Sequence, residues 1–142
     1  MNPPTPLTKR EEWTEQTIGE LVMKLSELSK KRLEGVDERL TAIVIECAKR
    51  CPFPFNVSEG QRSEAKQREY VRQGKSRTMK SKHLIGKAVD LYPLTMNRKA
   101  VDWTRFEDLA KVMFQVAGEM DVKLVWGGNW KTFVDKCHFE LK

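Results

Sequence analysis

Apolar residues recur at helical spacing in the first half of the chain. Residues 18–28 carry one stripe at intervals of three or four positions (Ile18, Leu21, Leu25 and Leu28), which predicts a helix packed on the rest of the protein, or alternatively a partner-binding helix. A second apolar face occupies residues 40–47, after Asp37, which can cap a helix. We expect that helix to end near Arg50, because Pro52 disfavours its continuation.

A third and longer helical pattern lies nearer the C-terminus. It starts at Asp102 or Thr104, and its inward face consists of Phe106, Leu109, Ala110, Met113, Phe114, Ala117 and Met120. The spacing alone accounts for these apolar residues, so they predict core rather than a cofactor site. A shorter, more polar helix is predicted from Glu64 to about Gln73, with Ser63 as its cap.

The segments between these helices have the patterns of short strands. Residues 53–57 alternate between apolar and other side chains, and residues 86–94 predict a core strand. Residues 123–126 and 137–141 predict two more strands, of which the last carries His138. Helices mixed with a few short strands predict an α+β fold, in which a small antiparallel sheet is backed by helices.

The composition agrees with a single globular domain. Of the 142 residues, 32% are charged and 39% are hydrophobic, as in folded soluble proteins. The apolar runs are too short to span a bilayer, so we expect no stable membrane insertion. The N-terminal region lacks the apolar core of a secretory signal, and three cysteines, an odd number, agree with reduced thiols. We therefore expect a protein that is made in the cytoplasm.

The net charge of +6 is concentrated in one segment. Residues 62–82 contain eight basic and two acidic residues, an excess equal to that of the whole chain. Such a segment can attract an anionic polymer, although a solvated basic helix and loop would look the same. Its last part, residues 75–82, is suited to the rim of a groove. A nucleic-acid-binding module is a remote alternative, because few aromatic residues interleave with these charges and no known fingerprint is present.

Both histidines and two aspartates are candidates for metal chemistry. His83, Asp90 and His138 can supply two imidazoles and a carboxylate, a recurring ligand set for a catalytic zinc that leaves one position open for water. A regular strand would point His83 and Asp90 to opposite faces, so Gly86 must permit a bend or bulge between them. Asp135 lies three residues before His138, close enough to serve the bound water.

The cysteines offer a different possible metal set. Cys47 and Cys51, together with Cys137 and His138, could form a structural zinc site. The spacing of Cys47 and Cys51 is not that of the usual close pairs, however. We therefore expect Cys47 in the core and Cys51 at a helix end.

Two short patterns surround the histidines, S-x-H-x-x-G-x-A-x-D at residues 81–90 and D-x-x-H at residues 135–138. The blocks 24–40, 55–62 and 125–141 occur with them in a fixed order. Together they resemble the zinc peptidases of the VanY/D-Ala-D-Ala carboxypeptidase family, and within that family the phage L-alanyl-D-glutamate endolysins most closely.

The resemblance implies a role for each residue of the site. The two histidines and Asp90 would bind Zn²⁺, and Asp135 would be the general base. Arg62 matches the family arginine after an E-G-x-R turn, and it would stabilise the developing oxyanion or hold a substrate carboxylate. Ser81 matches the family serine before the first ligand, and it would hydrogen-bond the substrate or support a ligand.

The resemblance also implies a function, zinc-dependent hydrolysis of the L-Ala-D-Glu bond of the peptidoglycan stem peptide during phage-driven lysis. A D,D-carboxypeptidase or dipeptidase that cuts D-Ala-D-Ala is the alternative. The partner would be the stem peptide, without nucleic acid, and we expect a monomer. Such an enzyme would stay in the host cytoplasm until a separate holin opens the inner membrane, and would then act in the periplasm or cell wall.

The resemblance starts near residue 24, which suggests a division of the chain. We expect residues 1–20 to be an N-terminal extension and residues 21–142 to be the zinc peptidase catalytic domain. The metal is expected on the open face of the sheet.

Overall fold

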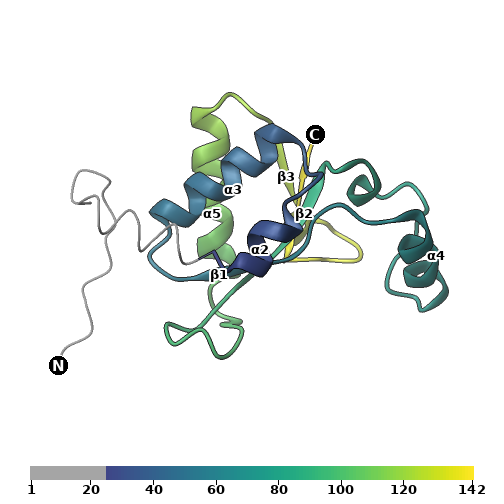
Figure 1. The fold of residues 1–142 in the computed structure, drawn as a ribbon, viewed down its shortest axis with the longest axis horizontal. Helices are drawn as coiled ribbons and strands as arrows, with labels where there is room; N and C mark the ends of the chain where they lie inside the picture. The colour runs from purple at the N-terminus through teal and green to yellow at the C-terminus, as the bar shows by residue number, and fades with distance from the viewer. Residues whose placement is uncertain (1–24) are drawn as a thin grey trace.

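The computed structural model describes residues 25–142, which form a small sheet with helices packed against it (Figure 1). The helices of this part of the chain are α2 (Glu27–Arg32), α3 (Glu38–Arg50), α4 (Glu64–Arg72) and α5 (Phe106–Glu119). The strands are β1 (Phe55–Glu59), β2 (Ala88–Pro93), β3 (Leu124–Trp126) and β4 (His138–Leu141). Two segments form short 3-10 helices, η2 (Lys82–Ile85) and η3 (Gly127–Asn129).

The strands make one antiparallel sheet in the order β1-β2-β4-β3. In the register of β2 and β4, Val89 lies opposite Phe139, and Asp90 lies opposite His138. Because side chains alternate across a strand, the first pair points to one face of the sheet and the second pair to the other. The predicted α+β fold with a small antiparallel sheet is confirmed.

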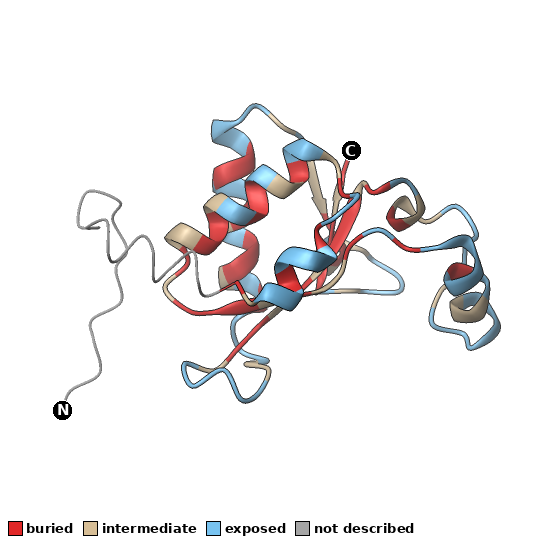
Figure 2. Cartoon of the chain, viewed as in Figure 1, coloured by how far each residue is buried: buried red, intermediate tan, exposed pale blue. Residues whose placement is uncertain are grey.

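The hydrophobic core lies on one face of this sheet, beneath α3 and α5. The two helices pack against each other, α5 also contacts β2 and β3, and their buried stripes face the strands (Figure 2). The strand residues Val89, Leu91 and Phe139 are 0% exposed in this core. Burial of each such side chain stabilises the fold by roughly 1.5–3 kcal/mol. The opposite face of the sheet is left for polar side chains.

The two helices predicted with caps are confirmed. The carboxylate of Asp37 accepts a hydrogen bond from the Arg39 backbone N–H at 2.9 Å, and α3 ends at Arg50 as expected. The Ser63 hydroxyl accepts from the Lys66 N–H at the start of α4. Both caps satisfy N–H groups that have no partner within the helix.

The long C-terminal helix, α5, differs from its prediction in its start and in two of its inward residues. It begins only at Phe106, and its side chains at Phe114 and Met120 are 36% and 40% exposed, so the prediction that they face inward is wrong. Val116 is buried in their place. One residue of an α-helix turns the side chain by about 100°, so Phe114 points away from the stripe that Met113 shares with the core.

The predicted helical stripe at residues 18–28 is only partly described. Ile18 and Leu21, like the expected extension at residues 1–20, lie outside the described residues. Ser26 caps α2, so Leu25 precedes this helix and is buried at 3% exposure. Leu28 is 53% exposed, and its predicted inward position is wrong.

All three cysteines are buried free thiols. Cys47 and Cys51 are 0% exposed within the hydrophobic core, which confirms their predicted places in the core and at the end of α3. Among residues 25–142, neither belongs to a group of side chains able to share a metal ion. The alternative of a structural zinc site at these cysteines is therefore dropped.

Candidate metal centre

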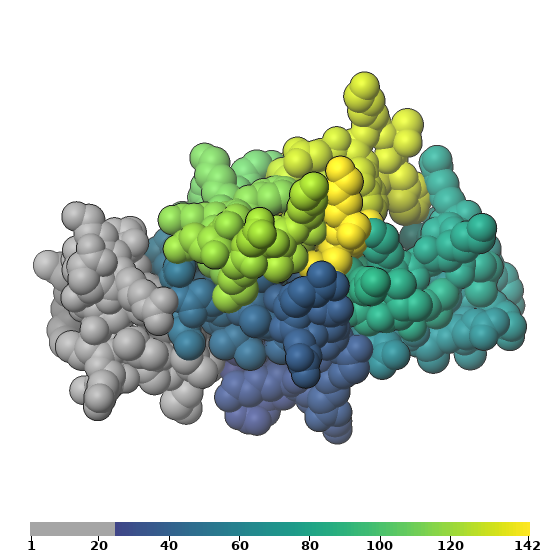
Figure 3. Space-filling model, turned by 90° about the horizontal axis from the view of Figure 1, so that it is seen from above, coloured from purple at the N-terminus to yellow at the C-terminus, as the bar shows by residue number. Residues whose placement is uncertain are grey.

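A groove of about 680 Å³ opens on the polar face of the sheet. One wall is formed by α4 and the loop that follows it, and the other by the loop at residues 130–137. Seen from above, the teal lobe around α4 stands apart from the yellow-green segment before β4, with a hollow between them (Figure 3). The expectation that the basic loop 75–82 borders a groove agrees with this arrangement.

Asp90 and His138 meet at the floor of the groove through strand pairing. They are opposite residues of β2 and β4, and Asp90 Oδ1 lies 3.3 Å from His138 Nδ1. The other ring nitrogen of His138, Nε2, lies 2.8 Å from Glu140 Oε1 on the same strand face. Glu140 is held in turn by Lys82 Nζ at 3.3 Å from Oε2.

His83 reaches the same point from η2. The Ser81 hydroxyl caps η2 by accepting from the His83 backbone N–H at 3.2 Å. Gly86 then ends the turn with φ of 70°, and a Cβ on it would lie 2.2 Å from the Gly35 carbonyl oxygen. Only glycine fits this turn. The predicted bend at Gly86 thus exists, and it brings His83 Nε2 to 3.3 Å from Asp90 Oδ1.

The hydrogen bonds of the two imidazoles fit a metal ion between them. His83 Nδ1 lies 2.8 Å from the Gly60 carbonyl oxygen, to which it must donate, so Nε2 carries the lone pair. This buried Nε2 makes no hydrogen bond. In the same way, an Nε2–H of His138 that donates to Glu140 leaves its Nδ1 lone pair directed at Asp90.

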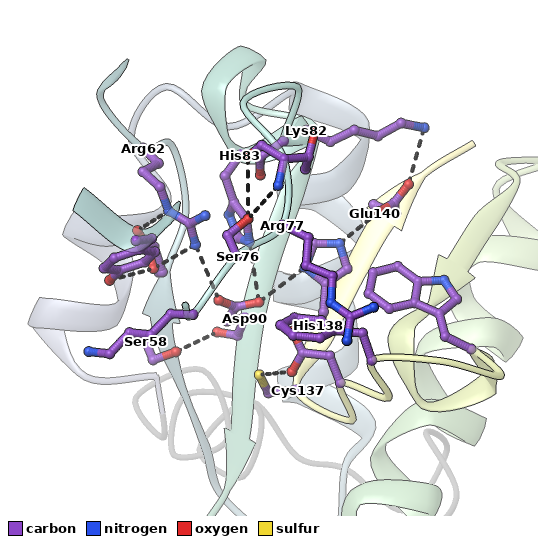
Figure 4. A pocket seen from close by; sticks show the side chains of 18 of the residues that line it. Ser58, Arg62, Ser76, Arg77, Lys82, His83, Asp90, Cys137, His138 and Glu140 are labelled. Carbon is purple, nitrogen blue, oxygen red and sulfur yellow. Dashed lines mark hydrogen bonds and ion pairs between the residues drawn. The ribbon is translucent and has the colours of Figure 1, made fainter. Parts of the chain in front are cut away.

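The spacing of these atoms also suits a metal (Figure 4). One donor atom from each of His83, Asp90 and His138 lies within 4.8 Å of the others. Bonds of about 2.0–2.1 Å in a tetrahedral zinc site separate two ligand atoms by roughly 3.3–3.4 Å. The two separations of 3.3 Å to Asp90 Oδ1 match this value. The three residues therefore form a group that could bind a metal.

The charges around Asp90 and His138 also suit a bound cation. Burial raises the pKa of Asp90, but the adjacent imidazoles of His138 and His83 outweigh it and hold the pKa well below its usual range. Burial lowers the pKa of His138, yet Asp90 and Glu140 raise it to about 9. Asp90 therefore stays anionic at neutral pH, as suits a residue that could bind a cation.

Asp135 lies beside this cluster. Its carboxylate comes within 4.8 Å of the Asp90 and Cys137 donor atoms, and the Cys137 thiol donates to Asp135 Oδ1 at 3.0 Å. The Asp135 N–H donates to the Gly127 carbonyl at 3.0 Å. A Cβ on Gly127 would lie 2.3 Å from the Asp135 carbonyl oxygen, so this glycine is needed for the loop to approach the site.

Asp90, Asp135 and Cys137 form a second group of possible ligands, which is less suited to a metal. Burial and the charge of Asp90 raise the pKa of the Cys137 thiol well above its ordinary value. Metal ligation requires the thiolate. The group with His83 instead contains a buried ring nitrogen that makes no hydrogen bond, so it is the better candidate for a metal site.

Arg62 is fixed at the edge of the groove next to Asp90. Its guanidinium donates to both carboxylate oxygens of Glu59, at 2.7 and 2.9 Å, and to Gln67 Oε1 at 2.6 Å. Its Nη2 lies 3.9 Å from Asp90 Oδ2. Each terminal nitrogen of a guanidinium has two N–H groups, so one donor on each remains for a substrate.

Two residues that contact Arg62 were not singled out from the sequence. Gln67 is 0% exposed, and besides accepting from Arg62 it donates to Ser76 Oγ at 2.9 Å and to the Thr78 carbonyl. Tyr70 places its ring 4.5 Å from Arg62 Cζ. A polar glutamine inside an amphipathic helix gives no sign of burial in the sequence.

Comparisons with known proteins agree with this arrangement. The family model described as phage L-alanyl-D-glutamate peptidase matches residues 21–141. An L-alanyl-D-glutamate peptidase of Escherichia phage T5 is 31% identical over 125 residues, 84% of this chain and 89% of that protein. One from Listeria phage A118 is 34% identical over 85 residues, 60% of this chain, and the match spans only 29% of that longer protein. The crystal structure of the Serratia marcescens L-Ala D-Glu endopeptidase ChiX matches with a TM-score of 0.75 and 38% identity, over 80% of this chain and 86% of that one.

Proposed function

The chain belongs to the phage L-alanyl-D-glutamate peptidase family, and we propose that it is a zinc-dependent endolysin that hydrolyses the L-Ala-D-Glu bond of the peptidoglycan stem peptide. The observation that carries this proposal is the family match over residues 21–141, which includes all three members of the metal cluster. We assign the catalytic domain to residues 21–142 on the same basis.

The metal ligands in this proposal are His83 Nε2, an Asp90 carboxylate oxygen and His138 Nδ1. The tautomers set by Gly60 and Glu140 support this assignment. When bound, zinc would supply an electrophile for the scissile carbonyl and lower the pKa of water from about 15.7 to about 7. Three protein ligands leave room for these functions, as in other catalytic zinc sites.

Asp135 is the proposed general base. It lies next to Asp90 without belonging to the histidine cluster, so its carboxylate is free to accept the proton of the attacking water. The same group then returns the proton to the amine nitrogen that leaves with D-Glu. The thiol of Cys137 and the carbonyl of Gly127 hold Asp135 in place for both transfers.

Arg62 and Ser81 complete the proposed site. Arg62 Nη2 lies 3.9 Å from Asp90 Oδ2, and from there its spare N–H group can donate to the oxyanion that develops on the scissile carbonyl. Glu59 and Gln67 fix the guanidinium beforehand, which avoids reorganisation during the reaction. Ser81 supports His83 through the cap of η2, and it lines the groove, where it can also meet the substrate.

The setting of the reaction is part of the same proposal. We place the active protein in the periplasm or cell wall, as a monomer, after synthesis in the host cytoplasm and release through a holin. Within residues 25–142, no helix is both long and apolar enough to cross a membrane. Expression with and without a co-expressed holin, followed by assay of the culture for cell lysis, tests the release step.

Mass spectrometry of digested peptidoglycan tests the bond that is cut. Purified wild-type protein should release fragments with a new D-Glu amino terminus. His83→Ala protein, purified in parallel, serves as the control for contaminating hydrolases. Release of free D-Ala without a D-Glu terminus would establish the D,D-carboxypeptidase alternative instead.

A further inference from the structure

Three cationic side chains gather around the ring of Tyr70 on one wall of the groove. Arg62 Cζ lies 4.5 Å, Lys75 Nζ 5.5 Å and Lys66 Nζ 5.6 Å from the ring centroid. Each of these distances is within the range of a cation–π contact. The aromatic ring therefore offsets part of the repulsion among the three like charges.

The carboxylate within this cluster does not balance the positive charge of the three cations. Glu59 accepts two hydrogen bonds from Arg62, lies 3.4 Å from Lys66 Nζ and accepts from the Tyr70 hydroxyl at 3.3 Å. One carboxylate thus serves two cations. Within the described part of the chain, no carboxylate forms an ion pair with Lys75. The nearby Glu69, whose pKa is lowered mainly by Arg72 and to a smaller degree by Lys75, forms its ion pair with Arg72. The cluster presents excess positive charge to the groove.

The cluster adjoins the metal centre. Arg62 lies next to Asp90 and stacks on the Tyr70 ring. Lys75 contacts the same ring, so only the side chains of Arg62 and Tyr70 separate its ammonium group from Asp90, the proposed metal ligand. All four residues line the same groove, and Arg62 marks this edge of it in Figure 4. A peptide whose scissile bond lies at Asp90 would pass the cluster within a short distance.

We propose that Lys75, assisted by Lys66 and the Tyr70 ring, forms a subsite for a free carboxylate of the peptide substrate. The inference rests on the proposed function, because a Glu residue within a peptide keeps one free carboxylate whichever of its carboxyl groups forms the next bond. Glu59 accepts from Arg62 through two guanidinium nitrogens and lies 3.4 Å from Lys66 Nζ, so Lys75 is the cation of this cluster that Glu59 does not engage. An ammonium beside a carboxylate forms a charge-assisted hydrogen bond.

The test combines enzyme variants with modified substrates. One substrate is a soluble stem tripeptide that begins L-Ala-D-Glu and has free carboxylates, and the other is the same peptide with those carboxylates converted to amides. Lys75→Gln is compared with Arg68→Gln, which removes the same charge from the exposed side of α4, where Arg68 pairs with Glu64. Steady-state kinetics are measured with both peptides, and Asp135→Asn protein with and without Lys75→Gln is titrated calorimetrically.

For the free-acid peptide, Lys75→Gln should raise KM and weaken binding by roughly three- to tenfold, with kcat nearly unchanged, as expected for one partly exposed charge contact. For the amide peptide, Lys75→Gln should have no further effect, and Arg68→Gln should leave both peptides unaffected. Equal losses on both peptides, or equal losses for Arg68→Gln, would indicate only long-range attraction of anions and would overturn the subsite.

The two proposals fail in different ways. Wild-type protein that binds the free-acid peptide without cutting it contradicts the proposed function, and the calorimetric comparison still decides the subsite. If the Asp135→Asn protein binds the free-acid and amide peptides with the same affinity, the carboxylate subsite is wrong even when cleavage is normal.

Discussion

Asp90 and His138 face each other across the paired strands β2 and β4, and Asp90 Oδ1 lies 3.3 Å from His138 Nδ1. Opposite residues of antiparallel strands hold their Cβ atoms about 4.5–5.5 Å apart. The sheet itself therefore sets the spacing of two proposed ligands. The third, His83, depends on the turn that Gly86 ends.

Removal of either histidine should abolish metal binding. His83→Ala and His138→Ala each leave two ligands, so both proteins should contain far less than one zinc per chain by elemental analysis. Wild-type protein should lose activity to a chelator and regain it with zinc. Zinc at about 100 times its Kd should also stabilise wild-type protein against unfolding by about 2.7 kcal/mol, and neither variant. Full activity after exhaustive chelation would contradict a zinc peptidase.

Asp135→Asn should distinguish a general base from a metal ligand. The amide keeps the size of the side chain but cannot accept the proton, so kcat should fall by about 10²–10⁴-fold while zinc stays bound. Zinc content and kcat are measured on the same preparation. Loss of zinc in this variant would place Asp135 on the metal, and wild-type turnover would exclude it as the base.

Glu140 should affect metal affinity through His138. It lies 2.8 Å from His138 Nε2 and fixes the ring nitrogen that faces Asp90. Glu140→Ala should weaken zinc binding by about 10–100-fold, as for other partners of metal ligands, and Glu140→Gln should weaken it less because an acceptor remains. Competition with a chromogenic chelator measures both affinities. Identical affinities for all three proteins would show that Glu140 is merely solvated.

Gly127→Ala should destabilise the loop that carries Asp135. Its Cβ would lie 2.3 Å from the Asp135 carbonyl oxygen, and relief of that overlap should cost about 1–3 kcal/mol in urea unfolding and reduce kcat. Gly118→Ala is the matched control, because a Cβ there has no neighbour within 4 Å and Gly118 lies in α5. That variant should be unchanged or more stable by about 0.5–1 kcal/mol.

The contribution of Glu59 to stability should depend on pH. Burial raises its pKa, but Arg62 outweighs burial and the pKa lies below its ordinary value of 4.5. A lowered pKa in the folded state stabilises the protein above that unfolded value, and the gain disappears as pH falls through the folded pKa. The difference in unfolding free energy between metal-free wild-type and Glu59→Gln proteins should therefore be constant near pH 7 and shrink below about pH 4.5. A difference that grows on acidification would show that the pKa of Glu59 is raised, not lowered, in the folded protein.

The parts predicted from the sequence are those that a local pattern determines. Helix caps and the spacing of apolar residues predicted α3 and α4, and Gly86 predicted the bend between His83 and Asp90. Burial of individual side chains was harder to predict, as the exposed Phe114 shows, because the width of the buried stripe depends on what covers the helix. The His83 tautomer is selected by the backbone carbonyl of Gly60. Every residue has such a carbonyl, so the sequence could not predict this contact.

The buried amide of Gln67 has a consequence for the thermodynamics of binding. It links Arg62 to Ser76 and to the Thr78 carbonyl, and so braces the loop that includes Lys75. Ordering a free loop side chain on binding costs about 0.5–1.5 kcal/mol for each one immobilised. A braced wall avoids part of this loss of conformational entropy. Gln67→Ala should therefore make peptide binding entropically less favourable, even where every atom that touches the peptide is retained.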